Sequence, residues 1–129
     1  MVLRGLIVKE PYASLIVDGL KTWEIRKNRT RVRGRILIIN KGYVKGSVEL
    51  YDVKGPFTAE ELIVYKNYHH APQDFLISYS NGKKLYAWLF RNPIKLNQPI
   101  KINIPQGAQV WVRINSTKIK ENKDLDSLL

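Results

Sequence analysis

The sequence predicts an α+β protein, a small mixed β-barrel of about five to seven strands with two or three short helices. Three observations lead to this expectation. Strand-like segments recur along the chain, few helical segments separate them, and 129 residues fit one domain. Sheets built from βαβ units have a helix between successive strands, so a barrel fits this pattern better.

The chain is expected to begin with a strand over residues 4–9 and a helix over residues 12–18. Pro11 suits the start of that helix, because its fixed φ and missing N–H are tolerated in the first turn. Gly19 lies where a left-handed C-cap is needed, so the helix should end there.

The segment 22–27 alternates as a strand does, with Trp23 and Ile25 on one face. The opposite face carries Thr22, Glu24 and Arg26. A cationic loop, 28–34, follows this strand.

Further strands are expected over 36–39, 47–53, 85–91, 100–104 and 110–114, with a turn within 40–46. Thr58 and Glu61 have the spacing of a capping box, which predicts a helix over 59–65. A second helix is expected around 74–79.

The composition excludes several classes of protein. No run approaches the roughly 18 apolar residues that cross a membrane, and the start of the chain lacks the pattern of a signal peptide. Cysteine is absent, which excludes disulfides, thiolate metal sites and a cysteine nucleophile. A cytoplasmic protein without a cofactor is the simplest expectation.

The charge of the chain is strongly basic, with 22 Lys and Arg against 11 acids and a formal net charge of +11. Part of this excess is concentrated: the segment 21–35 has seven cationic residues and one acid, Glu24. Such a charge favours a polyanionic partner, because phosphate contacts release counterions. A basic surface that is merely solvated remains the alternative.

The segment Gly19-Leu-Lys-Thr-Trp-Glu-Ile-Arg has the form G-x-K-x-x-E-x-R. Lys21 lies at the entrance to a strand, and Glu24 and Arg26 share one face of it. The spacing therefore brings an ammonium, a carboxylate and a guanidinium group into one small volume. Arg26 would offer a planar fork to a phosphate or a base edge, whereas the alternative is a surface ion-pair cluster.

This motif, preceded by Pro11-Tyr-Ala-Ser-Leu-Ile-Val-Asp, resembles the ASCH domain, a family named for its homology to activating signal cointegrator. The resemblance continues in order through the segments 33–39, 46–53, 86–93 and 109–114, with the stretch 67–84 matching weakly. It covers about residues 6–114. The resemblance implies a PUA-like barrel, here assigned to residues 1–115. Residues 116–129 are expected from the sequence to form a flexible tail.

ASCH domains are regarded as RNA- or DNA-binding modules, so the resemblance implies a cationic cleft around the motif that takes a nucleotide or base. Aromatic side chains, Tyr12 and Trp88, are candidates for stacking on it, although core packing is the alternative for Trp88. The expected ligand-binding residues are Tyr12, Ser14, Lys21, Thr22, Glu24, Arg26, Arg29, Arg31, Arg33 and Arg35. The four arginines 29–35 would contact phosphates, and Ser14 would either bind a ligand or bond locally.

A bacterial branch of the same family consists of amidohydrolases acting on N4-acetylcytidine, which implies an alternative function. Its catalytic Lys corresponds to Lys21, but Glu24 stands where that branch has a catalytic Thr. If the chain is an enzyme, Lys21 and Glu24 are the expected catalytic residues. The branch's distant Glu falls in the weakly matched stretch, whose candidates are Glu60, Glu61, His69, His70 and Asp74.

A metal-dependent nuclease is a third and weaker hypothesis, which rests on His69-His70, the one histidine pair of the sequence. Adjacent side chains in a strand point to opposite faces, so no metal site is expected from this pair. The sequence does not distinguish RNA, DNA and a free nucleoside as the ligand. It also leaves the oligomeric state open.

Overall fold

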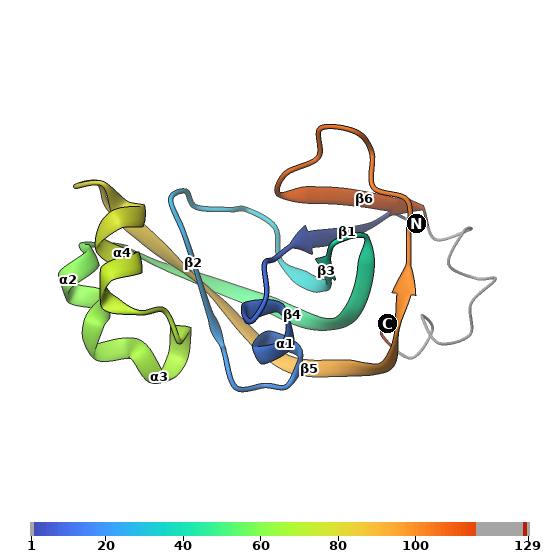
Figure 1. Ribbon diagram of the computed structural model, residues 1–129, viewed down its shortest axis with the longest axis horizontal. Coiled ribbons are helices and arrows are strands. Elements are labelled where there is room, and N and C mark those ends of the chain that lie inside the picture. The colour runs from blue at the N-terminus through green and yellow to red at the C-terminus, as the bar shows by residue number, and fades with distance from the viewer. Residues whose placement is uncertain (1, 116–127, 129) are drawn as a thin grey trace.

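The computed structural model describes residues 2–115 and Leu128 (Figure 1). In this part of the chain, six strands form one sheet in the order β2-β5-β4-β3-β1-β6. The strands are β1 (Val2–Ile7), β2 (Trp23–Arg26), β3 (Gly34–Asn40), β4 (Tyr43–Phe57), β5 (Leu85–Lys101) and β6 (Trp111–Asn115). Only β1 and β3 pair in parallel among these strands. The α+β prediction is confirmed, and the barrel is open, because β2 and β6 remain as edges of the described sheet.

The helices form three segments within the described residues, as expected. These are α1 (Tyr12–Val17), a continuous segment of α2 (Ala59–Leu62), the 3-10 turn η1 (Ile63–Tyr65) and α3 (Lys66–His69), and finally α4 (Gln73–Ser80). Asp18 caps α1, and Gly19 follows with φ of +82°, as the sequence predicted. The capping box between Thr58 and Glu61 is present. None of the helices in the described ranges has the length and apolar character that a membrane crossing requires.

One prediction about β structure was wrong, and another was confirmed over a shorter range. Residues 100–104 do not form a separate strand, because β5 runs without a break from Leu85 to Lys101. The turn expected within 40–46 shortens to Lys41 and Gly42, and β4 begins at Tyr43. Both strands extend beyond the predicted segments because β4 and β5 pair with each other along their length. The register of this pairing shifts at four places, and these shifts accommodate residues that usually end a strand.

The core lies on both faces of this sheet. One cluster packs between the sheet and α1 and includes Leu6, Ile16, Val48 and Trp88. Trp88 is therefore a core residue. The long strands β4 and β5 lie side by side along the molecule, with α2, α3 and α4 gathered at one end (Figure 1).

A second cluster lies on the face of the sheet opposite α1, the outer face. It includes Leu37, Ile39, Val112 and the buried side chain of Leu128. The remaining residues of the segment 116–129, expected to be a flexible tail, lie outside the described residues.

A third cluster packs α2 and α4 against β2 and β5 and includes Trp23, Ile25, Leu76 and Leu89. Because side chains alternate along β2, Trp23 and Ile25 point into this cluster. Glu24 therefore points to the opposite face of the sheet, where its cross-strand neighbour is Trp88.

Candidate functional site

A cleft of about 320 Å³ lies beside the G-x-K-x-x-E-x-R motif. Its lining includes Lys21, Glu24 and Arg26, so the structure brings together the three groups that the spacing placed in one volume. Two of them come from β2, and Lys21 comes from the turn between α1 and β2. Residues 7–10, at the end of β1 and just after it, together with α4, supply further parts of the lining.

The Lys21 side chain is buried, with 2% of its surface exposed. Its Nζ donates to the carbonyls of Trp23 and His69, at 2.6 Å in both cases. It also lies 3.4 Å from Oε1 of Glu24 and 5.0 Å from the centre of the Tyr12 ring. Three acceptors therefore surround the ammonium group and fix its position at the edge of the cleft.

Glu24 and Arg26 form an ion pair, in which Nε and Nη2 of Arg26 both donate to the same oxygen, Oε2 of Glu24, at 3.0 and 2.7 Å. Nη2 donates in addition to the carbonyl of Ile7, at 3.0 Å. The Nη1 group of Arg26 has no protein acceptor within the described ranges, and the ring of Trp88 lies beneath the guanidinium. Arg26 is therefore rigidly held while one donor edge remains available to a ligand.

The electrostatics of the cleft follow from burial. Burial lowers the pKa of Lys21 from its ordinary value, the charge of Arg26 adds to this effect, and the carboxylate of Glu24 opposes it. Burial and the nearby charge of Glu24 raise the pKa of Tyr12, so this phenol remains a neutral hydrogen-bonding group.

An aromatic wall, Tyr12–Phe75–Tyr79, closes one side of the cleft. The Phe75 ring lies 6.4 Å from that of Tyr12 and stacks on that of Tyr79 at 5.4 Å. Phe75 is 45% exposed. The sequence interpretation missed Phe75 and Tyr79, although their spacing of four in a predicted helix indicated a shared aromatic face.

Two other predicted ligand-binding residues do not line the cleft. The Ser14 hydroxyl lies 2.6 Å from Oε2 of Glu10 and accepts a hydrogen bond from Lys45 at 3.2 Å. Of the two alternatives for Ser14, the structure therefore shows the local bond. Thr22 joins two elements instead, because its N–H donates to the carbonyl of Tyr68 and its carbonyl accepts from Phe90.

Three of the four arginines between positions 29 and 35 are held by oxygen atoms of neutral groups. Arg29 donates to the carbonyl of Gly55 at 2.7 Å and covers the ring of Tyr86, while Arg33 donates to the carbonyls of Thr30 and Val32. Arg31 is exposed. Arg29, Arg31 and Arg33 do not line the cleft.

Arg35 lies apart from the cleft. Its side chain donates to the carbonyl of Asn92 and to the hydroxyl of Ser47. That hydroxyl donates in turn to the carbonyl of Leu128, in the outer cluster of the core. Arg35 therefore belongs to the outer face of the sheet.

The histidine pair has structural contacts. Nε2 of His69 lies 2.7 Å from the carbonyl of Leu62, and Nδ1 accepts from the N–H of Ala71 at 2.9 Å. The ring is thereby fixed as the Nε2–H tautomer, and burial lowers its pKa.

The candidates for the distant catalytic residue of the bacterial branch, Glu60, Glu61, His69, His70 and Asp74, do not line the cleft. Among the described side chains, Glu10 and Glu24 are the acids that do.

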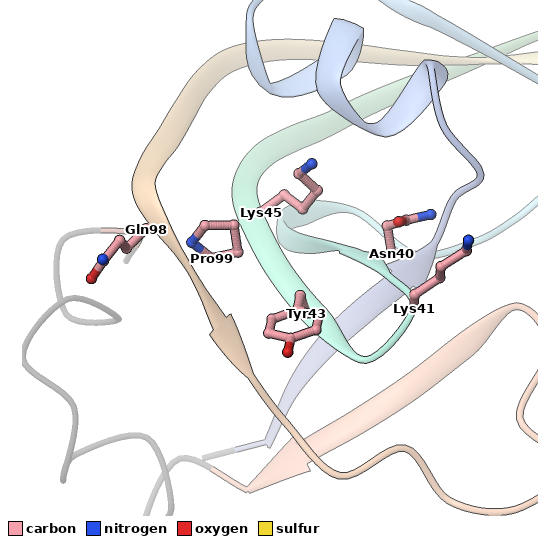
Figure 2. Close-up of a pocket in the computed structure, with 6 residues that line it drawn as sticks. All are labelled: Asn40, Lys41, Tyr43, Lys45, Gln98 and Pro99. Atoms are coloured by element: carbon pink, nitrogen blue, oxygen red, sulfur yellow. The ribbon is translucent and has the colours of Figure 1, made fainter.

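A second cavity, of about 640 Å³, lies at the β3–β4 hairpin (Figure 2). The Gln98 side chain points away from the other labelled residues (Figure 2). The Nζ of Lys45 is paired with Glu10 at 2.7 Å. Although this cavity is larger, its lining includes none of the motif residues Lys21, Glu24 and Arg26, so the cleft is the better candidate site.

Comparison with solved structures supports the fold. The ASCH protein of Zymomonas mobilis superposes with a TM-score of 0.78 at 21% identity, covering 97% of this chain and 94% of that chain. Two mutant forms of that protein each give a TM-score of 0.76 at 21% identity; the matches cover 97% of this chain and 94% or 96% of those chains. At this identity the likeness establishes the fold alone.

Comparison with protein families is more direct. No curated protein matches the chain. The ASCH domain family matches it over residues 6–100. Because this match spans well over half of the 129 residues and agrees with the motif and the fold, the chain belongs to the ASCH domain family.

Proposed function

We propose that this protein binds RNA, and that its cleft receives one unstacked nucleotide or base of the strand. The observation that carries the proposal is the combination, in one cleft, of a fixed guanidinium with a free donor edge and a half-exposed aromatic ring. Unstacked bases are recognised by this combination of stacking and hydrogen bonds to their edges. Membership of a family regarded as nucleic-acid-binding supports the same conclusion.

The size of the cleft agrees with a ligand of this kind. Its volume of about 320 Å³ is near the lower end of the roughly 300–1,000 Å³ range that is usual for small-molecule sites. Phe75 supplies the stacking surface, and Nη1 of Arg26 supplies donors to a base edge or a phosphate.

The arginines of the β2–β3 loop supply the proposed contacts to phosphates. No ion pair with a carboxylate neutralises Arg29, Arg31 or Arg33 among the residues that the structure describes. Backbone carbonyls hold two of them in place, so their charge is positioned without being neutralised. Arg35 would reach only a phosphate at the outer face.

A pair of variants on α4 tests this proposal. Phe75→Ala removes the exposed ring and should weaken binding of a labelled single-stranded RNA by about five- to hundredfold, as measured by fluorescence anisotropy. Ile77→Ala is the matched control, since Ile77 is equally exposed on the same helix but does not line the cleft. Equal affinities of the two variants would refute the proposed role of the cleft.

We also propose a cytoplasmic location and function without a cofactor. RNA in that compartment would be the principal partner. Binding of DNA oligonucleotides of the same sequence is the direct comparison, since contacts to the 2′-hydroxyl separate RNA from DNA.

Hydrolysis of an acylated nucleoside is the second candidate function. The observation in its favour is Lys21, a buried amine with a lowered pKa that lies beside Glu24 at the same cleft. Against it, Glu24 occupies the place of the expected hydroxyl nucleophile, and Nζ already has three acceptors. Acetate release from N4-acetylcytidine above the level of a Lys21→Ala variant would establish it; equal release would exclude that substrate.

A further inference from the structure

A second aromatic group lies outside the cleft, on the helical side of β2. Trp23 is its centre, with Phe57 stacked at 6.1 Å and Tyr68 stacked at 5.1 Å with an interplanar angle of 20°. Trp23 is buried, whereas Tyr68 is 49% exposed. One face of the Tyr68 ring is thus supported by the core, and no other stacked ring is found on it in the described part of the chain.

The backbone around this ring is held to the turn that carries the motif. The carbonyl of Tyr68 accepts from the N–H of Thr22 at 2.9 Å, and the carbonyl of the next residue, His69, accepts from Lys21. Nε2 of His70 lies 2.9 Å from the carbonyl of Leu20. Tyr68 is therefore a fixed surface, so a ligand would not need to order it on binding.

The surroundings of Tyr68 are apolar and cationic. Leu20 and Val64 are among the most exposed large apolar side chains, and Lys66 is exposed at the start of α3. Lys21 and Lys66 are the lysines whose charges act on His69, the residue next to Tyr68. An anionic strand whose bases present flat π-faces is the complementary ligand for such a surface.

We propose that Tyr68, backed by Trp23, is a second stacking site, which takes another base of the single strand whose unstacked nucleotide occupies the cleft. This inference rests on the proposed function, because it needs a nucleic acid at the cleft. Lys21 links the two sites: its Nζ lies over the Tyr12 ring of the cleft and also binds the carbonyl next to Tyr68. Stacking tolerates any base, so this site adds affinity and length dependence rather than sequence preference.

The test compares ligands of two lengths. Tyr68→Ala should weaken binding of a single-stranded octanucleotide by about five- to hundredfold and leave binding of a mononucleotide unchanged. Tyr68→Phe keeps the ring and should bind as the wild type does. Tyr43→Ala is the matched control, because Tyr43 has a similar exposure of 43% but lies at the start of β4.

A second measurement changes the octanucleotide instead of the protein, so that a misfolded Tyr68→Ala variant cannot be mistaken for the loss of a stacking site. Removing a single base at each position of the octanucleotide should reveal one position whose loss weakens wild-type binding but has no further effect on Tyr68→Ala. Octanucleotide binding that is equal in wild type and Tyr68→Ala, with Phe75→Ala impaired, would overturn the second site and leave the proposed function intact. Absence of octanucleotide binding by the wild type would overturn both.

Discussion

At the scale of single residues, the burial of Lys21 is the least expected feature of the molecule. A buried ammonium is costly unless hydrogen bonds and an opposite charge replace its hydration. Two carbonyls supply the hydrogen bonds and Glu24 supplies the charge. Glu24 is itself only 7% exposed and balances two cations, Lys21 and Arg26. The stability of the site thus depends on one carboxylate.

Glu24→Gln should therefore destabilise the protein strongly. The change leaves two cations without a counter-charge at a buried position, and breaking a buried pair in this way costs about 3–5 kcal/mol. The free energy of unfolding in urea measures the effect. Glu49→Gln is the control, because the Glu49–Arg91 pair has the same 2.7 Å contact at an exposed position and should contribute little. Equal losses in the two variants would contradict the importance of burial.

His69 makes the stability dependent on pH. Burial holds the pKa of His69 below its ordinary value of about 6.5, so the unfolded chain binds a proton more readily than the folded protein does. The free energy of unfolding should accordingly be unaffected by this residue above about pH 7 and should fall as the pH decreases below about 6.5. Unfolding titrations between neutral and mildly acidic pH measure this decrease.

The matched variants are His69→Asn, whose amide does not titrate, and His70→Gln. The decrease attributed to His69 should be absent from the first variant and present in the second. If the two variants retain the same pH dependence, other groups are responsible for it.

The sequence predicted the residues of the motif better than the rest of the cleft. Glu24 and Arg26 are two apart in a strand, so local geometry alone places them on one face. Phe75 reaches the same cleft from a helix about fifty residues later in the chain, and only tertiary packing brings it there. For the same reason the sequence did not decide whether Ser14 faced the cleft or bonded to Glu10.

At the scale of elements, β4 and β5 determine the architecture. The sequence indicated the central part of β4, 47–53, and the first part of β5, 85–91, from apolar patterns. It did not indicate their length, because Gly46, Pro93 and Pro99 are typical of turns. Register shifts between the two strands accommodate these residues, and no local sequence pattern predicts a cross-strand shift.

Gly46 is the residue of β4 that packs against Val17 of α1, and Gly46→Ala tests this contact. A Cβ there would meet the carbonyl oxygen of Ile94 and come within 2.8 Å of Cγ1 of Val17, so the variant should lose at least about 2 kcal/mol of stability. Gly82→Ala is the comparison: nothing lies within 4 Å of its added Cβ, and only its positive φ opposes the change, at about 1 kcal/mol. Thermal or urea unfolding of both variants measures the difference, and a larger loss at Gly82 would contradict the close packing of α1.

At the scale of the whole molecule, the acids and the cations are unevenly matched. Described carboxylates pair with Lys21 and Arg26 in the cleft, and with Lys45, Arg91 and Lys95 elsewhere. The cationic loop after β2 receives none of this pairing. Three arginines within five residues of this loop, Arg29, Arg31 and Arg33, therefore keep their full positive charge.

The salt dependence of RNA binding should accordingly depend on where charge is removed. Changing Arg29, Arg31 and Arg33 together to Gln should make the slope of log K against log salt concentration less steep by about 2, since each phosphate contact with a single strand contributes about 0.7. A control that changes Lys41, Lys83 and Lys101 to Gln removes the same charge from exposed positions in other parts of the molecule. Its slope should stay close to that of the wild type, because few of its lysines would contact the strand. Anisotropy titrations over a series of salt concentrations measure all three slopes. Equal flattening in the two triple variants would show that net charge, rather than the arginine loop, attracts the RNA, and would remove the loop from the proposed interface.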